Sequence, residues 1–403
     1  MRENLKDESL IKNISSELAL VALLSRPKLT THQVAQSSLL IKSIDFDYFR
    51  SLLNQHRLWV CVYCNINDHF STLFPKDLIT YLDEQYKKNV AQSHQQFIAY
   101  GQLLHLFKTA QIPVRTLKGI PLAKKLYGDI VKRHSKDIDL IIPADKIDLA
   151  HTKLTGLGYQ CEIYDQLPKQ KISLYFKAHK DLTYLSKTGT ALELHLRICP
   201  FLTDLSQHYT NQLFDTKHTE TLSDSELLYL CWHGSHTLYH RLKWLLDIAL
   251  YLEQLQSDNN PNFESLISLA KQLDLLRALT ISWKSANILY ETPLPEAINQ
   301  FYNQDKISQL LTKQSLIALN NPKQIHSITF KFEKYFGEIL LPQHWTNKWP
   351  ALIQKLNPDI IDILMLPAIP AKLSFLHKLL RPLTLCYRLI IGKKYLPGFH
   401  QKK

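Results

Sequence analysis

The stretch that decides the fold is Arg133-His134-Ser135-Lys136-Asp137-Ile138-Asp139-Leu140-Ile141-Ile142. Its apolar second half predicts a buried β-strand over residues 138–142. Side chains alternate across a strand, so Asp137 and Asp139 share one face, with Cα atoms about 6–7 Å apart. Ile138, Leu140 and Ile142 then point towards a core on the other face. The segment therefore predicts two acids on the open face of a half-buried strand.

A second segment, Leu192-Glu193-Leu194-His195-Leu196-Arg197, alternates strictly between leucines and polar residues. If it lies beside the first strand in one sheet, Glu193 joins Asp137 and Asp139. Adjacent carboxylates repel each other and are costly to desolvate, so a fold that gathers them commonly supplies a cation. Asp-x-Asp alone is weak evidence, since a solvated strand end explains most such pairs. Three acids on one face instead predict a site for Mg²⁺ or Mn²⁺, held together with substrate phosphates.

Lys118-Gly119 stands where a short strand turns into a helix. A helix N-terminus offers free backbone N–H groups and a positive dipole end to phosphate, and Gly119 would let the backbone approach closely. Taken alone, a plain turn glycine and a solvated surface lysine are the simpler interpretation of these two residues. Arg133 either neutralises a phosphate or pairs with the aspartates. His195 either orients Glu193, contacts a nucleotide or has only a structural role.

The chain divides into three regions by its hydrophobic pattern. Residues 1–110 predict helices, from apolar residues at three- and four-residue steps. Residues 111–200 predict a small α/β core, and residues 201–403 are helical again. The fold class is thus α+β, with a mixed small sheet between helical flanks. Strands are expected at 112–117, 138–142, 158–163, 172–178, 182–186 and 191–198, the last pair of them joined as a hairpin.

Ser223-x-x-Glu226 predicts a capping box that opens a helix running to about residue 255. On that helix His233, His236 and His240 would share one face. They could touch substrate phosphates, bind zinc with a further ligand, or simply pack against the α/β region. Asp247 is expected to pair with Arg241 or Lys243.

Lys and Arg outnumber Asp and Glu by 48 to 36, a net charge of +12 that suits a polyanionic partner without choosing one. Six scattered cysteines in a chain of this size favour reduced thiols and a cytoplasmic location. The sequence predicts neither a secretory signal nor a transmembrane segment. Residues 371–395 are basic and apolar, which is compatible with peripheral contact with an anionic membrane or with packing on the body.

Together, Leu117-Lys118-Gly119, Tyr127, Arg133 through Leu140 and Glu193-Leu194-His195 resemble an uncharacterised family of bacterial nucleotidyltransferases in the DNA polymerase beta-like superfamily. The helix with His233 and His236, and the run from Arg241 to Asp247, add to the resemblance. It implies a polymerase beta-like core in which Asp137, Asp139 and Glu193 bind metal. Ile120 after Gly119 and Leu196 after His195 depart from the family's usual pattern.

The function expected from this resemblance is transfer of an NMP group from an NTP to an acceptor by two-metal-ion catalysis. Lys118, Gly119, Arg133, His195, His233 and His236 would bind the nucleotide or its phosphates. The acceptor, whether a small molecule, a protein or RNA, is not indicated. The alternative is a catalytically silent adaptor that uses the same fold to bind a nucleotide or a membrane surface.

Overall fold

The computed structural model describes residues 14–167, 169–199, 203–215, 223–257, 263–322 and 327–355, together with positions 10, 12, 325, 357, 375–376, 378–381 and 383. Over these residues the chain is mostly helical and contains one four-stranded sheet, an α+β fold as predicted. No helix among them is both long enough and apolar enough to cross a membrane.

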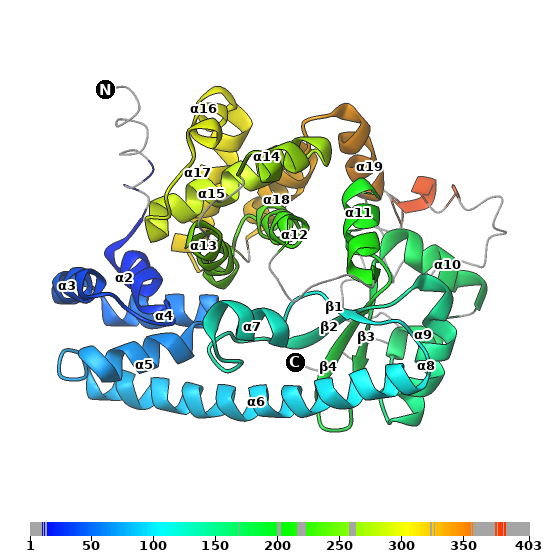
Figure 1. Cartoon of the computed structure of the whole chain (residues 1–403), viewed down its shortest axis with the longest axis horizontal. Helices are drawn as coiled ribbons and strands as arrows, with labels where there is room; N and C mark the ends of the chain where they lie inside the picture. The colour runs from blue at the N-terminus through cyan, green and yellow to red at the C-terminus, as the bar shows by residue number, and fades with distance from the viewer. Residues whose placement is uncertain are drawn as a thin grey trace.

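The N-terminal region is helical, as its periodicity predicts. Its helices are α2 (Ser16–Leu24), α3 (Thr31–Leu40), α4 (Phe46–His56), α5 (Trp59–His69) and α6 (Lys76–Thr109). Local capping sets three of the starts: Ser15 accepts the Leu18 N–H, Thr30 and Gln33 form a reciprocal capping box, and Asp45 accepts two backbone N–H groups. Helix α6 has 34 residues and runs along one edge of the molecule, beneath both the helical body and the sheet (Figure 1).

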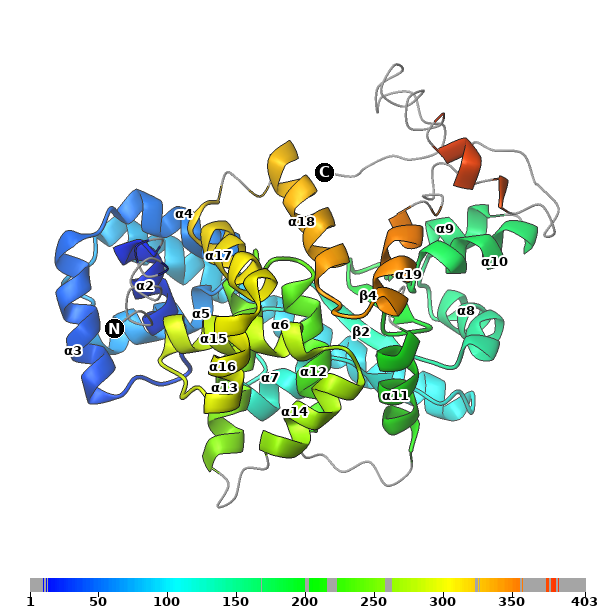
Figure 2. The same cartoon turned by 90° about the horizontal axis from the view of Figure 1, so that it is seen from above.

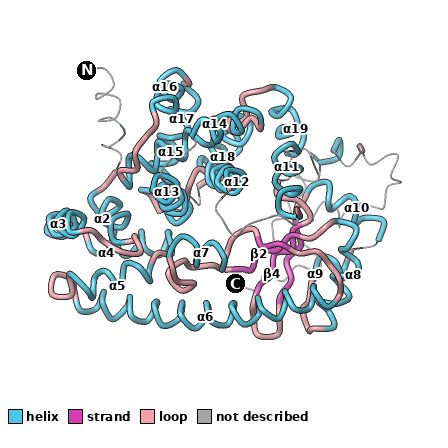
Figure 3. The backbone as a smooth tube through the Cα atoms, viewed as in Figure 1, coloured by secondary structure: helices cyan, strands magenta, loops and turns pink. Residues whose placement is uncertain are grey.

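The sheet has the order β1-β2-β4-β3, with β1 at Arg115–Thr116, β2 at Asp137–Ile141, β3 at Asp181–Leu185 and β4 at Ala191–His195. Strands β2 and β4 are parallel, and the other two pairs are antiparallel. The prediction that the two acid-bearing strands are neighbours is confirmed, because Asp139 pairs with Glu193 in the register. The β3–β4 hairpin is also confirmed (Figure 3).

Two predicted strands are wrong. Residues 172–178 belong to helix α10 (Lys169–Ala178), and in 158–163 only Gln160 makes an isolated bridge before α9 (Glu162–Gln166). In the first segment Ile172, Tyr175 and Phe176 also fit a helical spacing, so short apolar runs of this kind do not separate the two periods. Helices α7 (Ile120–Tyr127) and α8 (Ile147–Gly156) complete the α/β region.

The C-terminal helices are α11 (Thr203–Phe214), α12 (Asp224–Ser235), α13 (Leu242–Ser257), α14 (Phe263–Gln272), α15 (Leu276–Tyr290), α16 (Glu296–Gln304), α17 (Lys306–Asn320), α18 (Ile328–Leu340) and α19 (Trp345–Lys355). Ser223 caps α12 by accepting from the Glu226 N–H, as predicted, but the Glu226 carboxylate pairs with Lys125 and does not complete the capping box. The single helix expected from 223 to 255 is wrong, however, since α12 ends at Ser235 and α13 begins at Leu242.

Packing explains this break. Leu238 and Tyr239 have positive φ angles of 52° and 42°, which bulky residues rarely adopt. The Tyr239 ring folds back over Gly234, where a Cβ atom would lie only 2.1 Å from it, and its hydroxyl is 2.5 Å from the Ser282 hydroxyl. The buried Tyr239 side chain thus holds the turn that ends α12 and redirects the chain.

Two clusters of buried side chains underlie the fold. One cluster packs the C-terminal part of α6, together with α8, against one face of the sheet. That face carries Ile138, Leu140, Ile142, Leu192 and Leu194. The other joins α2–α5 to the C-terminal helices and α7. The N-terminal and C-terminal helices therefore share a core, and the outer face of the sheet is turned towards it (Figures 1 and 2). The division at 110 and 200 stays a prediction.

Candidate active site

The three predicted acids line one cavity of about 350 Å³. Asp139 and Glu193 occupy paired positions on the parallel strands β2 and β4, and Asp137 lies two residues before Asp139. Ile138 and Leu140 enter the core, as the alternation predicts. The whole lining is Arg57, Lys118, Arg133, Ser135, Lys136, Asp137, Asp139, Glu193, His233, His240, Arg241, Lys243 and Trp244. The cavity thus combines a cluster of carboxylates with a set of basic side chains. We call this set the basic wall: Arg57, Lys118, Arg133, Lys136, Arg241 and Lys243.

The acids differ in their electrostatic surroundings. Burial opposes ionisation of Asp139, but the charge of Lys118 and a hydrogen bond from His195 outweigh it, so its pKa lies below the usual value. Burial, followed by the negative charges of Asp139 and Asp137, raises the pKa of Glu193 to about 8. The cluster therefore holds more negative charge than the protein alone compensates. Hard oxygen donors with excess negative charge fit Mg²⁺ or Mn²⁺.

His195 is the third member of the closest set of ligand atoms in the described residues. Atoms of Asp139, Glu193 and His195 all lie within 4.8 Å of one another, whereas Asp137 is outside this set. His195 Nε2 lies 3.1 Å from Asp139 Oδ1, and its Nδ1 lies 3.1 Å from Lys180 Nζ. Because the ammonium can only donate to Nδ1, the Nε2–H donates to Asp139. Burial and the charge of Lys180 lower the pKa of His195, so the ring is neutral and fixes Asp139.

Lys180 and Asp181 complete this network and had no motif to reveal them. They form an ion pair of 2.8 Å at the start of β3, on the far side of His195 from Asp139. Asp181 continues the acid-bearing face, because it pairs with His195 in the β3–β4 register. The strand alternation around Asp181 was the only sequence signal for its position.

Lys118 and Gly119 sit next to the acids. Both line a small space with Asp137 and Asp139, and Lys118 also lines the larger cavity, with its ammonium 5.5 Å from the centre of the Tyr229 ring. Gly119 precedes the first residue of α7 with φ 70° and ψ −127°, a conformation that side chains with a Cβ rarely adopt. The backbone at the start of α7 therefore requires glycine whatever else the site does.

Arg133 is buried and bound to Asp247. Its Nε and one terminal nitrogen donate to the two Asp247 oxygens at 2.8 Å each, and the Tyr127 hydroxyl donates to the same carboxylate at 2.8 Å. The expected pairing of Asp247 with Arg241 or Lys243 is therefore wrong. Arg241 lies before α13 and donates to the Gln55 carbonyl, while Lys243, on the same helix as Asp247, donates to the His134 carbonyl.

The three histidines do not share one helix face. His233 and His240 line the cavity, and each ring packs edge-on with that of Trp244. His236 stacks on Trp232 at 4.6 Å and bonds the His233 carbonyl, and it is not among the lining residues. Burial, followed by the charge of Lys118, holds the pKa of His233 well below its usual value. The ring of His233 is therefore neutral in this site.

The basic wall brings like charges together. Burial and then the charge of Arg57 lower the pKa of Arg241 to about 10, and burial and Arg133 lower that of Lys243 to about 7. Arg57 comes from the N-terminal region, where it ends α4 in a left-handed conformation with φ 56°. Helix α6 also holds the loop before β2, since Asn89 donates to Val131 O at 2.9 Å and Gln92 to Ser135 O at 3.1 Å. The N-terminal region, for which the sequence offered no chemistry, thus builds part of the site.

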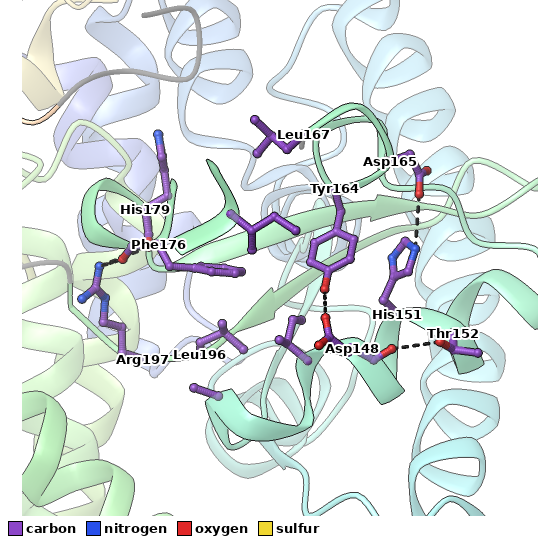
Figure 4. Close-up of a pocket in the computed structure, with 13 residues that line it drawn as sticks. Asp148, His151, Thr152, Tyr164, Asp165, Leu167, Phe176, His179, Leu196 and Arg197 are labelled. Carbon is purple, nitrogen blue, oxygen red and sulfur yellow. Dashed lines mark hydrogen bonds and ion pairs between the residues drawn. The ribbon is translucent and has the colours of Figure 1, made fainter. Parts of the chain in front are cut away.

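A larger cavity of about 850 Å³ lies elsewhere, between α8, α9 and α10 (Figure 4). Its walls carry the Tyr164–Asp148 hydrogen bond and the 3.2 Å pair of His151 with Asp165, and Leu196 and Arg197 close one side. None of the predicted site residues lines it. The predicted metal-binding residues Asp137, Asp139 and Glu193 therefore line only the smaller of these two cavities.

A small mixed sheet that brings acids together from neighbouring parallel strands is the arrangement expected of a nucleotidyltransferase. Residues 42–291, more than half of the chain, match the model of a family described as "Uncharacterised nucleotidyltransferase", and the chain belongs to that family. No curated protein and no solved structure matches it. The family spans α4 to α15, so the helices that supply Arg57 and Asp247 lie inside it.

Proposed function

We propose that this chain transfers an NMP group from an NTP to an acceptor, with Asp137, Asp139 and Glu193 holding Mg²⁺ or Mn²⁺. The observation that carries the proposal is the pairing of Asp139 with Glu193 across two parallel strands, inside a cavity whose other wall is basic. The carboxylates are suitable ligands for a divalent cation, and the basic side chains on the opposite wall are suited to bind a triphosphate. Membership of a nucleotidyltransferase family supports the same class of reaction.

In the proposed reaction an acceptor oxygen forms a bond to the α-phosphorus while the bond from that phosphorus to the bridging oxygen breaks. Pyrophosphate leaves, and the Glu193 carboxylate takes the proton of the acceptor hydroxyl. A bound divalent cation would neutralise phosphate charge and lower the pKa of that hydroxyl. Lys118, Arg57, Arg241 and Lys243 would bind the triphosphate, and most of the rate enhancement would come from positioning and charge.

Of the residues predicted to bind the nucleotide, some line the cavity and others only position a neighbouring side chain. His195 acts through Asp139, which it orients, and Arg133 acts through Asp247, which it needs as a partner. His233 lines the cavity and can contact the nucleotide, whereas we do not assign His236 a contact with it. Gly119 allows the phosphate to approach the start of α7. The acceptor and the preferred base stay open, and the cytoplasmic location stays a prediction.

The direct test is pyrophosphate release from the four NTPs with Mg²⁺ or Mn²⁺, with wild type compared with Asp139→Asn and Glu193→Gln. The exposed acid Asp145 next to the sheet provides a matched control as Asp145→Asn. We expect release by wild type and the control, and a loss of at least about a hundredfold in both site variants. Equal release by Asp139→Asn and wild type would contradict the proposal.

The adaptor alternative predicts nucleotide binding without turnover. The predicted membrane segment 371–395 lies largely outside the described residues, so it adds no support to that alternative. All three acids are present in one cavity, which favours an active site over a silent one.

A further inference from the structure

The C-terminal helices α18 and α19 expose an unusual set of large apolar side chains. Phe332, Phe336, Trp345 and Trp349 are 60%, 62%, 75% and 58% exposed, and Tyr335 is 48% exposed. We call these five residues the aromatic surface. Their spacing of three and four residues along each helix places them on one face of α18 and one face of α19.

This exposure does not come from a helix that fails to pack. The other face of α18 is buried, since Phe330 is 4% exposed and its ring lies 6.2 Å from that of His240. Gly337 lets α18 approach Leu238 and Leu311, where an added Cβ would lie 3.3 and 3.4 Å from their side chains. A helix that is apolar on all sides normally has partners on all sides. Helix α18 therefore has one apolar face in use and another available.

Lysines outnumber acids among the accessible charges around the aromatic surface. Exposed Lys331 and half-buried Lys348 accompany one half-buried acid, Glu333, whereas Glu338 is buried and burial lowers the pKa of Lys334. The ammonium of Lys348 lies 5.1 Å from the centre of the Trp345 ring. Protein interfaces are enriched in aromatics and arginine but depleted in lysine. Exposed Trp, Tyr and Phe interleaved with lysine are instead typical of a surface that inserts among anionic lipid headgroups.

We propose that the aromatic surface of α18 and α19 docks the protein on an anionic membrane. The indole, phenol and phenyl rings enter the boundary between headgroups and acyl chains, while Lys331 and Lys348 contact lipid phosphates. Helices α18 and α19 lie on one side of the molecule (Figure 2). Membrane docking does not depend on the proposed nucleotidyl transfer.

The test is co-sedimentation of the full chain with vesicles of phosphatidylcholine alone or mixed with phosphatidylglycerol. The site variant combines Phe332→Glu, Trp345→Glu and Trp349→Glu. The matched control places three glutamates at exposed apolar positions on other helices, Leu39→Glu, Ile98→Glu and Leu149→Glu. Circular dichroism and thermal melting show that both variants are folded.

We expect wild type and the control to bind the mixed vesicles, with weaker binding at high salt, and the site variant to lose roughly tenfold or more in partitioning. Indole fluorescence of wild type should shift to the blue on binding. The same three charges in both variants separate loss of the apolar contact from a change in net charge.

Three results would overturn the proposal. The first is no binding of wild type to mixed vesicles. The second is unchanged binding by the site variant, which would assign any membrane contact to another segment. The third is a concentration-dependent dimer of wild type, seen by light scattering without lipid and lost in the site variant, which would make the surface a contact between two copies.

Discussion

Arg133 and Asp247 form a two-point ion pair whose side chains are only 4% and 1% exposed. The pair ties the loop before β2 to α13, and the Tyr127 hydroxyl brings α7 to the same carboxylate. Each of these elements contributes to the surroundings of the carboxylates. The position of Asp137 and Asp139 relative to the basic wall therefore depends on the hydrogen bonds that Arg133 and Tyr127 make to Asp247.

Breaking this pair should unfold the protein more easily. Removing one partner leaves the other charge buried without compensation, so we expect Asp247→Asn or Arg133→Met to lower the free energy of unfolding by about 3–5 kcal/mol. Urea denaturation measures this. The double variant Arg133→Met, Asp247→Leu should recover part of the loss, because it removes both charges. Lys146→Met, in an exposed pair with Asp145, should change stability by less than about 1 kcal/mol.

Two glycines should respond to alanine in opposite directions. Gly119→Ala forces a Cβ-bearing residue to φ 70° and should cost about 1–3 kcal/mol. Gly101 lies inside α6, where an added Cβ would meet no other atom within 4 Å, so Gly101→Ala should stabilise by about 0.5–1 kcal/mol. Thermal denaturation distinguishes the two. A stabilised Gly119→Ala would show that the start of α7 adopts another backbone conformation in solution.

Metal binding can be measured without turnover. We expect Asp139→Asn to weaken Mn²⁺ binding by at least about tenfold in calorimetry or electron paramagnetic resonance, since it removes a ligand and charge together. Asp145→Asn, an exposed acid in the short turn after β2, should bind as wild type does. Identical Mn²⁺ affinity in wild type and Asp139→Asn would place the cation elsewhere.

His56 should make stability depend on pH. Its ring is buried, accepts from the Leu242 N–H at 3.1 Å and donates to the Leu319 carbonyl at 2.9 Å, so only the neutral form fits. Burial lowers its pKa from 6.5 to about 3. Between these values the unfolded chain binds the proton and the folded chain does not, so this contribution is complete above pH 6.5 and is lost as pH falls towards 3.

The size of that effect is about 5 kcal/mol when the titration is complete. Urea denaturation at a series of pH values should therefore show a shallower acid limb for His56→Gln than for wild type. The exposed His32→Gln provides the control, with an unchanged limb. Parallel curves for wild type and His56→Gln would mean that His56 is protonated in the folded state.

Arg57 tests the contribution of the N-terminal helices to the site. It lines the cavity, so Arg57→Gln should weaken binding of a non-hydrolysable NTP by about tenfold or more, the value of one charge-assisted hydrogen bond. Arg50→Gln, which breaks an ion pair of α4 with Asp77, should leave nucleotide affinity unchanged. Equal affinities in both variants would remove Arg57 from the phosphate site.

Much of the candidate site could be predicted from the local pattern of polar and apolar residues. Alternation of polar and apolar side chains over 137–140 and 192–197 decided which side chains face the core, because a strand has only two faces. The same rule failed for 172–178, where an apolar run fits a helix and a strand equally. The helix from 223 to 255 failed for another reason. Its break depends on Tyr239 packing over Gly234, a contact that periodicity does not contain.

The sequence by itself determined the three carboxylates, the lysine and glycine beside them, and the small mixed sheet, because alternation, charge and turn chemistry act over a few residues. Only the tertiary structure decided the partners of those groups. Asp247 reaches Arg133 across 114 residues, and Arg241 reaches Gln55 across 186. Such pairings depend on which helices share a core, and that is set by the shape of many packed side chains together.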